Sequence, residues 1–187
     1  MRIGLIRAAG VAIAIGGLMG AAEAQMRPPV NIGAAVGDVG PGWKKQPGSD
    51  EGVTYVCDAE SCGGRGVLGL SQAAATPDYV KGVIADPDKM LASYQYASEE
   101  SMKPTGCAFV KYEVKRLGDR RVRYDSTGKC PQGSFAAMTT IFDADRPTMM
   151  AVQVLTGSES GALKLRDASA DKIVHALEQD AAAPAEQ

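Results

Sequence analysis

Four cysteines are the residues of this 187-residue chain whose chemistry is easiest to define. Cys57 and Cys62 belong to the stretch YVCDAESC, and Cys107 and Cys130 follow further along. Thiols can bind zinc, exchange electrons or form crosslinks. A zinc site favours closely spaced Cys and His ligands, but Cys107 and Cys130 lie far apart and His175 is the single His. A thioredoxin-like redox pair needs the spacing C-x-x-C. Disulfides are therefore favoured, provided that the chain enters an oxidising compartment.

The first 24 residues indicate that compartment. Arg2 and Arg7 give a positive start, residues 8–20 are apolar, and Ala22-Glu23-Ala24 is a small-residue cleavage pattern. The apolar run of about 15 residues is shorter than the roughly 20 that a spanning helix needs. We therefore expect a signal peptide at residues 1–24, cleaved near Ala24. The mature protein is expected to be periplasmic or secreted, without a membrane anchor.

The composition favours one domain without a polyanionic partner. The formal charge is −2 at pH 7, and removal of residues 1–24, with two Arg and one Glu, changes it to −3. This near-neutral balance predicts no nucleic-acid partner. The remaining chain of about 160 residues suits a single core. Its even number of cysteines predicts two disulfides and no free thiol.

Four cysteines allow three pairings, and the pattern between Cys107 and Cys130 favours one of them. Apolar and charged residues alternate along 107–116, as in a half-buried strand, and LGDR then precedes a second strand at 121–124. This pattern predicts a β-hairpin, which brings Cys107 near Cys130 and leaves Cys57 to pair with Cys62. The other two pairings stay open at this point.

Burial should decide the register of this hairpin, because a one-residue slip moves every side chain to the other face of the sheet. A three-residue loop pairs Val114 with Tyr124 and keeps the apolar side chains together, whereas a two-residue loop mixes the faces. The favoured register leaves the two cysteines one residue out of alignment. We expect an irregular stretch at 126–129 to absorb this offset, so that a bridge can form.

Proline, glycine and helix-capping residues divide the chain. Residues 25–41 predict a flexible N-terminal segment, residues 42–178 a single domain, and residues 179–187 a disordered tail. Helices are expected to begin at Thr76, at Asp86 and at Ser169. The segment from Asp86 to about Ser98 is either a second helix or the continuation of one broken helix that begins at Thr76. Strands are expected near 42–46, 53–58, 65–72 (interrupted by glycine), 107–116, 121–124, 135–142 and 149–156. This order predicts the α+β class: an antiparallel sheet with helices packed on it, in a domain crosslinked by disulfides.

The same order of elements resembles the Mog1/PsbP-like α/β/α sandwich group. Trp43, GVTYVC and SADKIVHALEQ carry the resemblance, which spans about residues 42–178. Members of that group are mostly accessory or assembly proteins rather than enzymes. The resemblance therefore implies a binding or stabilising role, and it implies no particular site residue.

Catalytic and metal-binding candidates are few. A Ser-His-Asp arrangement needs a His as base, and His175 lies one helical turn after Asp171, a spacing typical of an ordinary surface contact. Neither G-x-S-x-G nor H-E-x-x-H occurs. The stretch DADRPT from Asp143 lacks most EF-hand ligands and predicts a plain turn. We therefore predict no catalytic residue, no metal and no cofactor.

The predicted hairpin region is basic, with eight Lys or Arg against three acidic residues between Lys103 and Lys129. One interpretation is an anion-binding site that contacts an acidic partner or a membrane surface. The favoured alternative is a solvated strand face whose charges protect a sheet edge from aggregation. The candidate anion-binding residues are Lys115, Arg116, Arg120, Arg121 and Arg123.

The sequence thus favours an exported, non-enzymatic binding or accessory protein of the bacterial cell envelope. Its partner would be an envelope protein or a small ligand, and membrane contact is not favoured. The alternative is a periplasmic enzyme that uses carboxylates or a redox-active disulfide. The oligomeric state is open.

Overall fold

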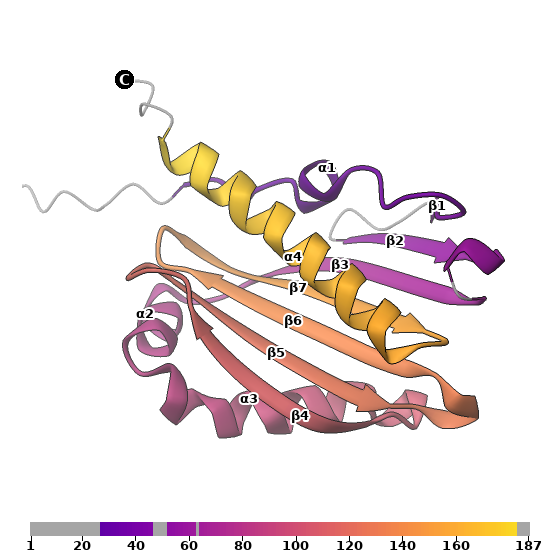
Figure 1. Ribbon diagram of the computed structural model, residues 1–187. Coiled ribbons are helices and arrows are strands. Elements are labelled where there is room, and N and C mark those ends of the chain that lie inside the picture. The colour runs from indigo at the N-terminus through magenta and orange to yellow at the C-terminus, as the bar shows by residue number, and fades with distance from the viewer. Residues whose placement is uncertain (1–26, 47–51, 63, 183–187) are drawn as a thin grey trace, which may run out of the picture.

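Seven antiparallel strands form one sheet in the order β1-β2-β3-β7-β6-β5-β4 (Figure 1). The computed structural model describes residues 27–46, 52–62 and 64–182, so the predicted signal peptide lies outside the described residues. The strands are β1 (Lys44–Gln46), β2 (Gly52–Cys57), β3 (Gly66–Ala74), β4 (Ala108–Arg116), β5 (Arg121–Lys129), β6 (Phe135–Asp143) and β7 (Arg146–Thr156). The helices are α1 (Ile32–Val36), α2 (Pro77–Ala85), α3 (Pro87–Met102) and α4 (Glu159–Ala182), with short 3-10 turns η1 (Glu60–Cys62), η2 (Lys103–Thr105) and η3 (Pro131–Gly133).

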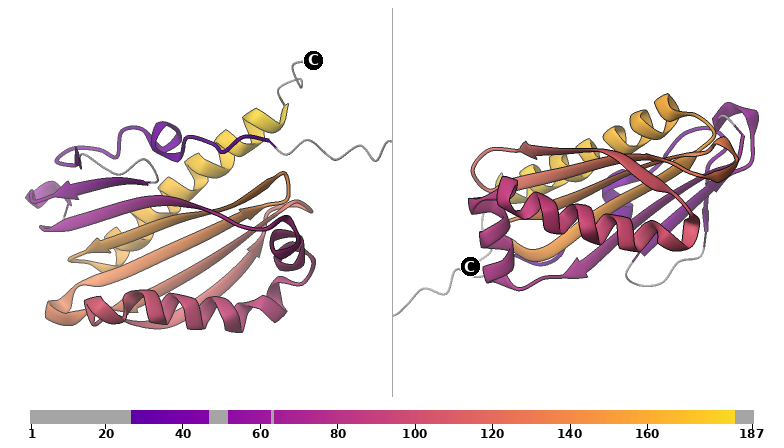
Figure 2. Two further views of the ribbon diagram at one scale, coloured as in Figure 1. Left: turned by 180° about the vertical axis from the view of Figure 1, so that it is seen from behind. Right: turned by 90° about the horizontal axis from the view of Figure 1, so that it is seen from below.

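The helices lie on both faces of the sheet (Figure 2). Helix α4 crosses one face over β6 and β7 with α1 beside it, whereas α2 and α3 lie on the other face. Because successive residues of a strand point to opposite faces, the strands contribute to two cores. Leu68 and Ile173 belong to the core under α4, and Val80 and Phe142 to the core under α2 and α3. The predicted α+β class, with an antiparallel sheet and helices packed on it, is confirmed.

Both predicted helix starts in the middle of the chain are confirmed. The Thr76 side chain accepts a hydrogen bond from the Tyr79 N–H at 3.3 Å, and Asp86 accepts one from the Lys89 N–H at 3.2 Å. A proline in the first turn follows each cap, where its missing N–H costs no hydrogen bond. The two segments are therefore separate helices, and the second extends past Ser98.

The predicted start of the last helix was wrong. Helix α4 begins at Glu159, where the Ser158 side chain accepts a hydrogen bond from the Gly161 N–H at 3.2 Å. Ser169, the predicted cap, lies inside the helix and is buried. Arg166 also occupies a buried position, so before Ala170 the inward face of this helix mixes polar residues with the buried Ala162. Apolar periodicity therefore marked only its second half.

The folded part of the chain is longer at both ends than the predicted domain. The segment expected to be flexible, residues 25–41, contains α1, and Ile32 and Val36 are 5% and 2% exposed in the core under α4. At the other end α4 continues to Ala182, so the first residues of the predicted tail are helical. The boundaries at residues 42 and 178 are therefore too narrow.

The hairpin register is confirmed. The irregular residue that compensates for the one-residue offset between Cys107 and Cys130 lies in β4, and not in β5 as predicted. Val114 pairs with Tyr124, as face matching requires. The irregularity is a bulge at Val110 in β4, whereas β5 pairs regularly up to Lys129. Gly128 lies opposite this bulge, where a Cβ atom would be 2.5 Å from the Ala108 carbonyl oxygen. Glycine therefore permits the close approach of the two backbones.

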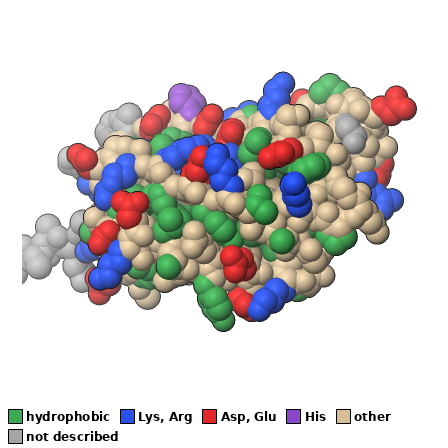
Figure 3. Space-filling model, turned by 60° about the horizontal axis from the view of Figure 1, so that its bottom comes forward, with side chains coloured by type: hydrophobic (Ala, Val, Ile, Leu, Met, Phe, Trp, Pro, Cys, Tyr) green, Lys and Arg blue, Asp and Glu red, His purple; other side chains and the backbone are tan. Residues whose placement is uncertain are grey.

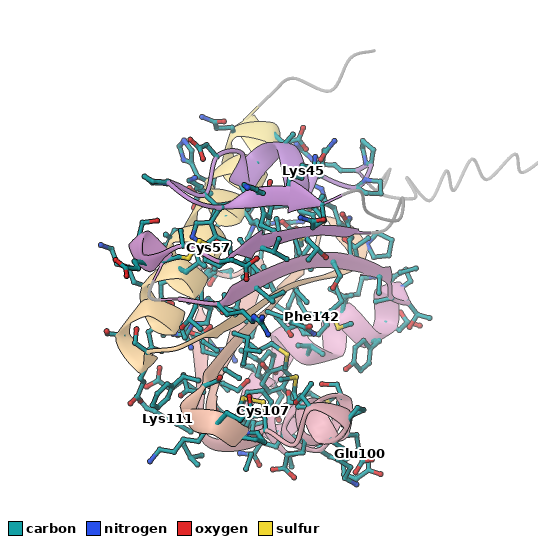
Figure 4. The ribbon with its side chains drawn as sticks, turned by 90° about the vertical axis from the view of Figure 1, so that its right-hand side faces the viewer. Lys45, Cys57, Glu100, Cys107, Lys111 and Phe142 are labelled. Atoms are coloured by element: carbon teal, nitrogen blue, oxygen red, sulfur yellow. A yellow bond between two sulfur atoms is a disulfide. The ribbon has the colours of Figure 1, made fainter. Side chains whose placement is uncertain are left out.

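Two disulfides join neighbouring cysteines along the chain. Cys57 and Cys62 link β2 to η1 with a Cα separation of 6.4 Å, and Cys107 and Cys130 join the open ends of the hairpin strands with a Cα separation of 4.0 Å. No free cysteine occurs in the described residues. Cys57 and Cys107 lie in different parts of the molecule (Figure 4). The two bridges therefore stabilise separate regions.

Replacing both Cys107 and Cys130 with Ala should lower the free energy of unfolding more than replacing Cys57 and Cys62. In the chain-entropy model the longer loop contributes about 3.5 kcal/mol and the shorter about 2 kcal/mol. Urea denaturation of the oxidised proteins measures both losses. Alkylation of the denatured, unreduced wild type, followed by mass spectrometry, should show no thiol adduct, and two or more adducts would contradict the pairing.

Candidate functional site

The candidate anion-binding residues of β5 are buried beneath α4. The Arg123 side chain is 6% exposed, and its Nε donates to Asp125 Oδ1 at 2.7 Å. The rest of its guanidinium binds Asp171 Oδ1 at 3.2 Å and Asp167 Oδ1, both on α4. Arg123 therefore joins the sheet to the helix. The interpretation as a solvated strand face was wrong for this residue, because acidic residues distant in sequence cover it.

Asp125 is the central carboxylate of this network. Its oxygens accept hydrogen bonds from Arg123, from Thr139 Oγ1 at 2.5 Å and from Lys115 Nζ at 2.8 Å. Burial by itself raises the pKa of Asp125, but these three hydrogen bonds and the Arg123 charge outweigh it and leave the pKa lowered. Asp125 is therefore held in its ionised form.

A second ionic cluster fixes the C-terminal end of α4. The buried carboxylate of Asp143 accepts from Arg121 Nε at 2.8 Å and lies 3.4 Å from Arg146 Nη1. Arg146 also binds Asp180, and Arg121 donates to the Leu177 carbonyl oxygen at 3.2 Å, both on α4. Buried arginines from two strands thus hold the last turns of the helix.

The remaining candidate cations also have partners within the protein. Arg116 donates to the carbonyl oxygens of Ile84 at 2.9 Å and Ala85 at 3.3 Å, at the end of α2. Arg120 binds Asp145 on the surface. Basic and acidic side chains are interspersed on this side of the molecule (Figure 3). An added anion would have to displace these partners, so anion binding at the five residues stays a prediction that the pairing disfavours.

A charged cleft of about 230 Å³ lies where β4 and β5 meet the first half of α4. Lys111 lies on the α4 side of β4, away from Glu100 on α3 (Figure 4). In this cleft Lys111 binds Glu113 at 2.6 Å and lowers the pKa of Glu113 despite the opposing effect of burial. Glu113 and Asp125 are the carboxyl groups of the cleft with a perturbed pKa, and in both the pKa is lowered. A general acid requires a raised pKa instead. The cleft gives no support to carboxylate-based catalysis.

His175 and the DADRPT turn offer no catalytic or metal site. His175 is exposed and lies 2.9 Å from the Gln179 amide nitrogen, while Asp171 binds Arg123. Asp143 at the turn is occupied by two arginines. Within residues 27–46, 52–62 and 64–182, no group of three or more His, Cys, Asp or Glu side chains could hold a metal ion.

An apolar groove of about 280 Å³ opens on the opposite face of the sheet. Helices α2 and α3 cover β4, β5 and β6, and leave β1, β2 and β3 uncovered on that face (Figure 2, left). The groove lies where the covered and uncovered halves meet, beside the end of α3. Its lining is Thr54, Val67, Gly69, Met102, Thr105, Phe109, Ala136, Ala137, Met138, Gln153, Val154 and Leu155. None of these residues is ionisable, so the groove is suited to bind apolar surface and not to transfer protons.

A row of paired residues forms the floor of the groove. Thr54 pairs with Gly69, Gly69 with Gln153, and Gln153 with Met138. A Cβ atom at Gly69 would meet the Cβ and the carbonyl oxygen of Gln153, each at an ordinary 3.9 Å. Packing in the sheet therefore does not require this glycine, and its missing side chain keeps the floor open. The sequence marked the position as a glycine interruption in a strand, a pattern that indicates close approach of a ligand or another backbone.

The described residues thus define a disulfide-linked α+β protein with an apolar groove beside a half-covered sheet. Among residues 27–46, 52–62 and 64–182, no helix has the length and apolar composition that crossing a bilayer requires. No protein-family model and no curated protein matches the chain.

Two solved structures show a distant similarity. The chain is 8% identical to human StAR-related lipid transfer protein 5, with 74% of this chain and 88% of that chain covered and a TM-score of 0.27. It is 12% identical to a fragment of the STAR-related lipid transfer protein from Xanthomonas axonopodis, with 74% and 98% covered and a TM-score of 0.24. These TM-scores are too low to support an argument about this protein. The resemblance to the Mog1/PsbP-like group stays a prediction.

Replacing Asp125 with Asn should lower the free energy of unfolding by about 3 kcal/mol at pH 7, because it removes the buried carboxylate that pairs with Arg123 and leaves this buried arginine with its partners on α4 alone. Since the pKa of Asp125 is lowered in the folded protein, its contribution is present above the unfolded pKa of about 4 and is lost as the pH falls through the folded value. The difference between variant and wild type should therefore be constant between about pH 7 and 5 and shrink below about pH 4. Urea denaturation over this pH range measures it.

Asp58→Asn is the matched control. Asp58 is 77% exposed and pairs with Arg65 at 3.6 Å, so its loss should cost less than about 1 kcal/mol. Equal losses in the two variants, or a loss in Asp125→Asn that is as large at pH 3 as at pH 7, would contradict the role of Asp125.

Proposed function

We propose that this chain is an exported, non-enzymatic binding protein of the bacterial cell envelope, and that the apolar groove holds a small apolar ligand. The observation that carries the proposal is the lining of the groove, which consists of apolar and uncharged polar side chains around an open floor at Gly69. Ligand sites in proteins are mostly apolar with a few polar groups that fix orientation, and Thr54, Thr105 and Gln153 are such groups here.

The rigidity of the surrounding elements supports a preformed site. The floor belongs to the sheet, and the wall includes Met102 at the end of α3 and Phe109 next to the bulge in β4. The Cys107–Cys130 disulfide closes the hairpin beside this wall. A ligand that enters a preorganised site loses less free energy to ordering the protein. The bridge therefore contributes to affinity as well as to stability.

Export is supported by the expected signal peptide and by the pairing of all four cysteines. The Mog1/PsbP-like resemblance also favours a binding or accessory role over catalysis. In the charged cleft the pKa values of Glu113 and Asp125 are lowered, which does not favour either group as a general acid.

Expression of the full chain in a bacterium should yield a periplasmic or secreted protein whose first residue is Gln25. N-terminal sequencing of the fractionated protein tests this, and replacement of Ala22 and Ala24 with bulky residues should block processing. An uncleaved protein retained in the cytosol with free thiols would overturn the proposed location.

Gly69→Leu should fill the groove and weaken the binding of an uncharged apolar probe, N-phenyl-1-naphthylamine, by at least about tenfold. The matched control is Ser71→Leu, which adds the same side chain to the same strand and the same face, outside the groove. Fluorescence titration should give saturable binding to the wild type and to Ser71→Leu. No saturable binding to the wild type, or unchanged binding to Gly69→Leu, would rule out the groove as the ligand site.

A further inference from the structure

A second cavity, of about 570 Å³, lies on the α4 side of the sheet, so it is separated from the groove by the sheet itself. The chain leading into α1 forms one wall, and strands β1, β2, β3 and β7 contribute the others. Val30, Ile32 and Val53 give the cavity an apolar portion, whereas Gln72 and Thr148 give it polar atoms. Lys45 is exposed, and none of the lining residues in the described part of the chain is acidic.

Two residues that line this cavity, Gln72 and Thr148, each carry a buried side-chain atom, Nε2 and Oγ1, that lacks a hydrogen-bond partner among the described residues. The residue Thr148 is 7% exposed. Only one other such side-chain atom, Ser98 Oγ, occurs in the described part of the chain. A buried polar group without a partner destabilises a protein, so two of them around one cavity need an explanation. A ligand that supplies both partners explains them.

The wall formed by the N-terminal segment is held in place on both sides. Before α1, the Pro28 carbonyl oxygen accepts a hydrogen bond from Arg146 Nε at 3.0 Å. At the end of α1 and just beyond it, Lys172 Nζ donates to the carbonyl oxygens of Val36 at 2.7 Å and Asp38 at 2.9 Å. Arg146 and Lys172 belong to β7 and α4, so the body of the protein fixes this wall. The cavity is thus part of the fold and not a gap under a loose segment.

We propose that this cavity binds a small carboxylate with an apolar body. The amide N–H of Gln72 and the hydroxyl of Thr148 would donate to the carboxylate oxygens, and the ammonium group of Lys45 favours a negative charge. Val30, Ile32 and Val53 would contact the apolar body. This ligand differs in charge from the one assigned to the groove, and the site lies on the other face of the sheet.

The stability of the ligand-free protein gives the first test. Gln72→Leu and Thr148→Val replace the unpartnered atoms with apolar groups of similar shape, so the melting temperature should stay unchanged or rise by a few degrees. Thermal denaturation of the purified variants measures this. A fall in melting temperature in both variants would show that the two atoms already have partners, and it would overturn the inference.

Ligand binding gives the second test, with sodium octanoate as the probe in isothermal titration calorimetry. Octanoate should bind at least tenfold more tightly than octylammonium, and Gln72→Leu and Thr148→Val should each weaken octanoate binding at least tenfold. Lys45→Gln should weaken it several-fold, whereas Lys44→Gln, a change at the neighbouring residue on the other face of β1, should have no effect.

The two sites are distinguished by crossing the variants. Gly69→Leu should leave octanoate binding unchanged, and Gln72→Leu should leave binding of the apolar probe in the groove unchanged. Octanoate binding that is lost in Gly69→Leu but retained in Gln72→Leu would place the carboxylate in the groove and overturn the second site. Equal affinity for octanoate and octylammonium would overturn the assignment of charge.

Discussion

The hydrogen bonds that converge on the Asp125 carboxylate are the interaction on which the position of α4 depends. A helix laid across a twisted sheet needs a fixed crossing point, and the largest fully buried apolar side chains of α4, Ile173 and Leu177, lie in its second half. In its first half Ala162 packs on the same core, and toward the middle of the helix Arg123 adds an ionic contact by connecting Asp125 to Asp167 and Asp171. A buried ion pair of this kind adds less to stability than to specificity, because its desolvation offsets much of the attraction. Here it joins α4 to β5 at a defined point along the helix.

Local patterns predicted local structure well. Thr76 and Asp86 predicted two helix starts correctly because a cap and a proline act within one turn. The pairing of Val114 with Tyr124 was predicted correctly because buried residues in a strand recur with a period of two. The bulge at Val110 was missed because its cause is a contact between strands: the glycine that permits it, Gly128, is on the partner strand.

Long-range contacts account for the rest of the errors. The basic residues of the hairpin suggested a surface, and no pattern near Arg123 indicates that Asp167, 44 positions later, would cover it. The groove follows from which strands α2 and α3 leave uncovered, a property of packing that no single segment encodes. Only the glycine at position 69 gave a local indication of the site. Polar residues on a buried helix face, such as Arg166 and Ser169, break the periodicity on which helix prediction depends.

The contact between Arg27 and α4 has a consequence for how this protein can be attached to anything else. Arg27 donates to the carbonyl oxygens of Asp180 and Ala181, so the two ends of the described chain leave the body at one corner (Figure 1). That corner adjoins the β6–β7 turn, where the Arg27 backbone N–H donates a hydrogen bond to the Asp145 carbonyl oxygen. The groove lies toward the other end of these strands, near Ala136 and Leu155. A tether that leaves the folded body at Arg27 or at Ala182 would therefore hold the molecule by the same point and leave the groove facing outward.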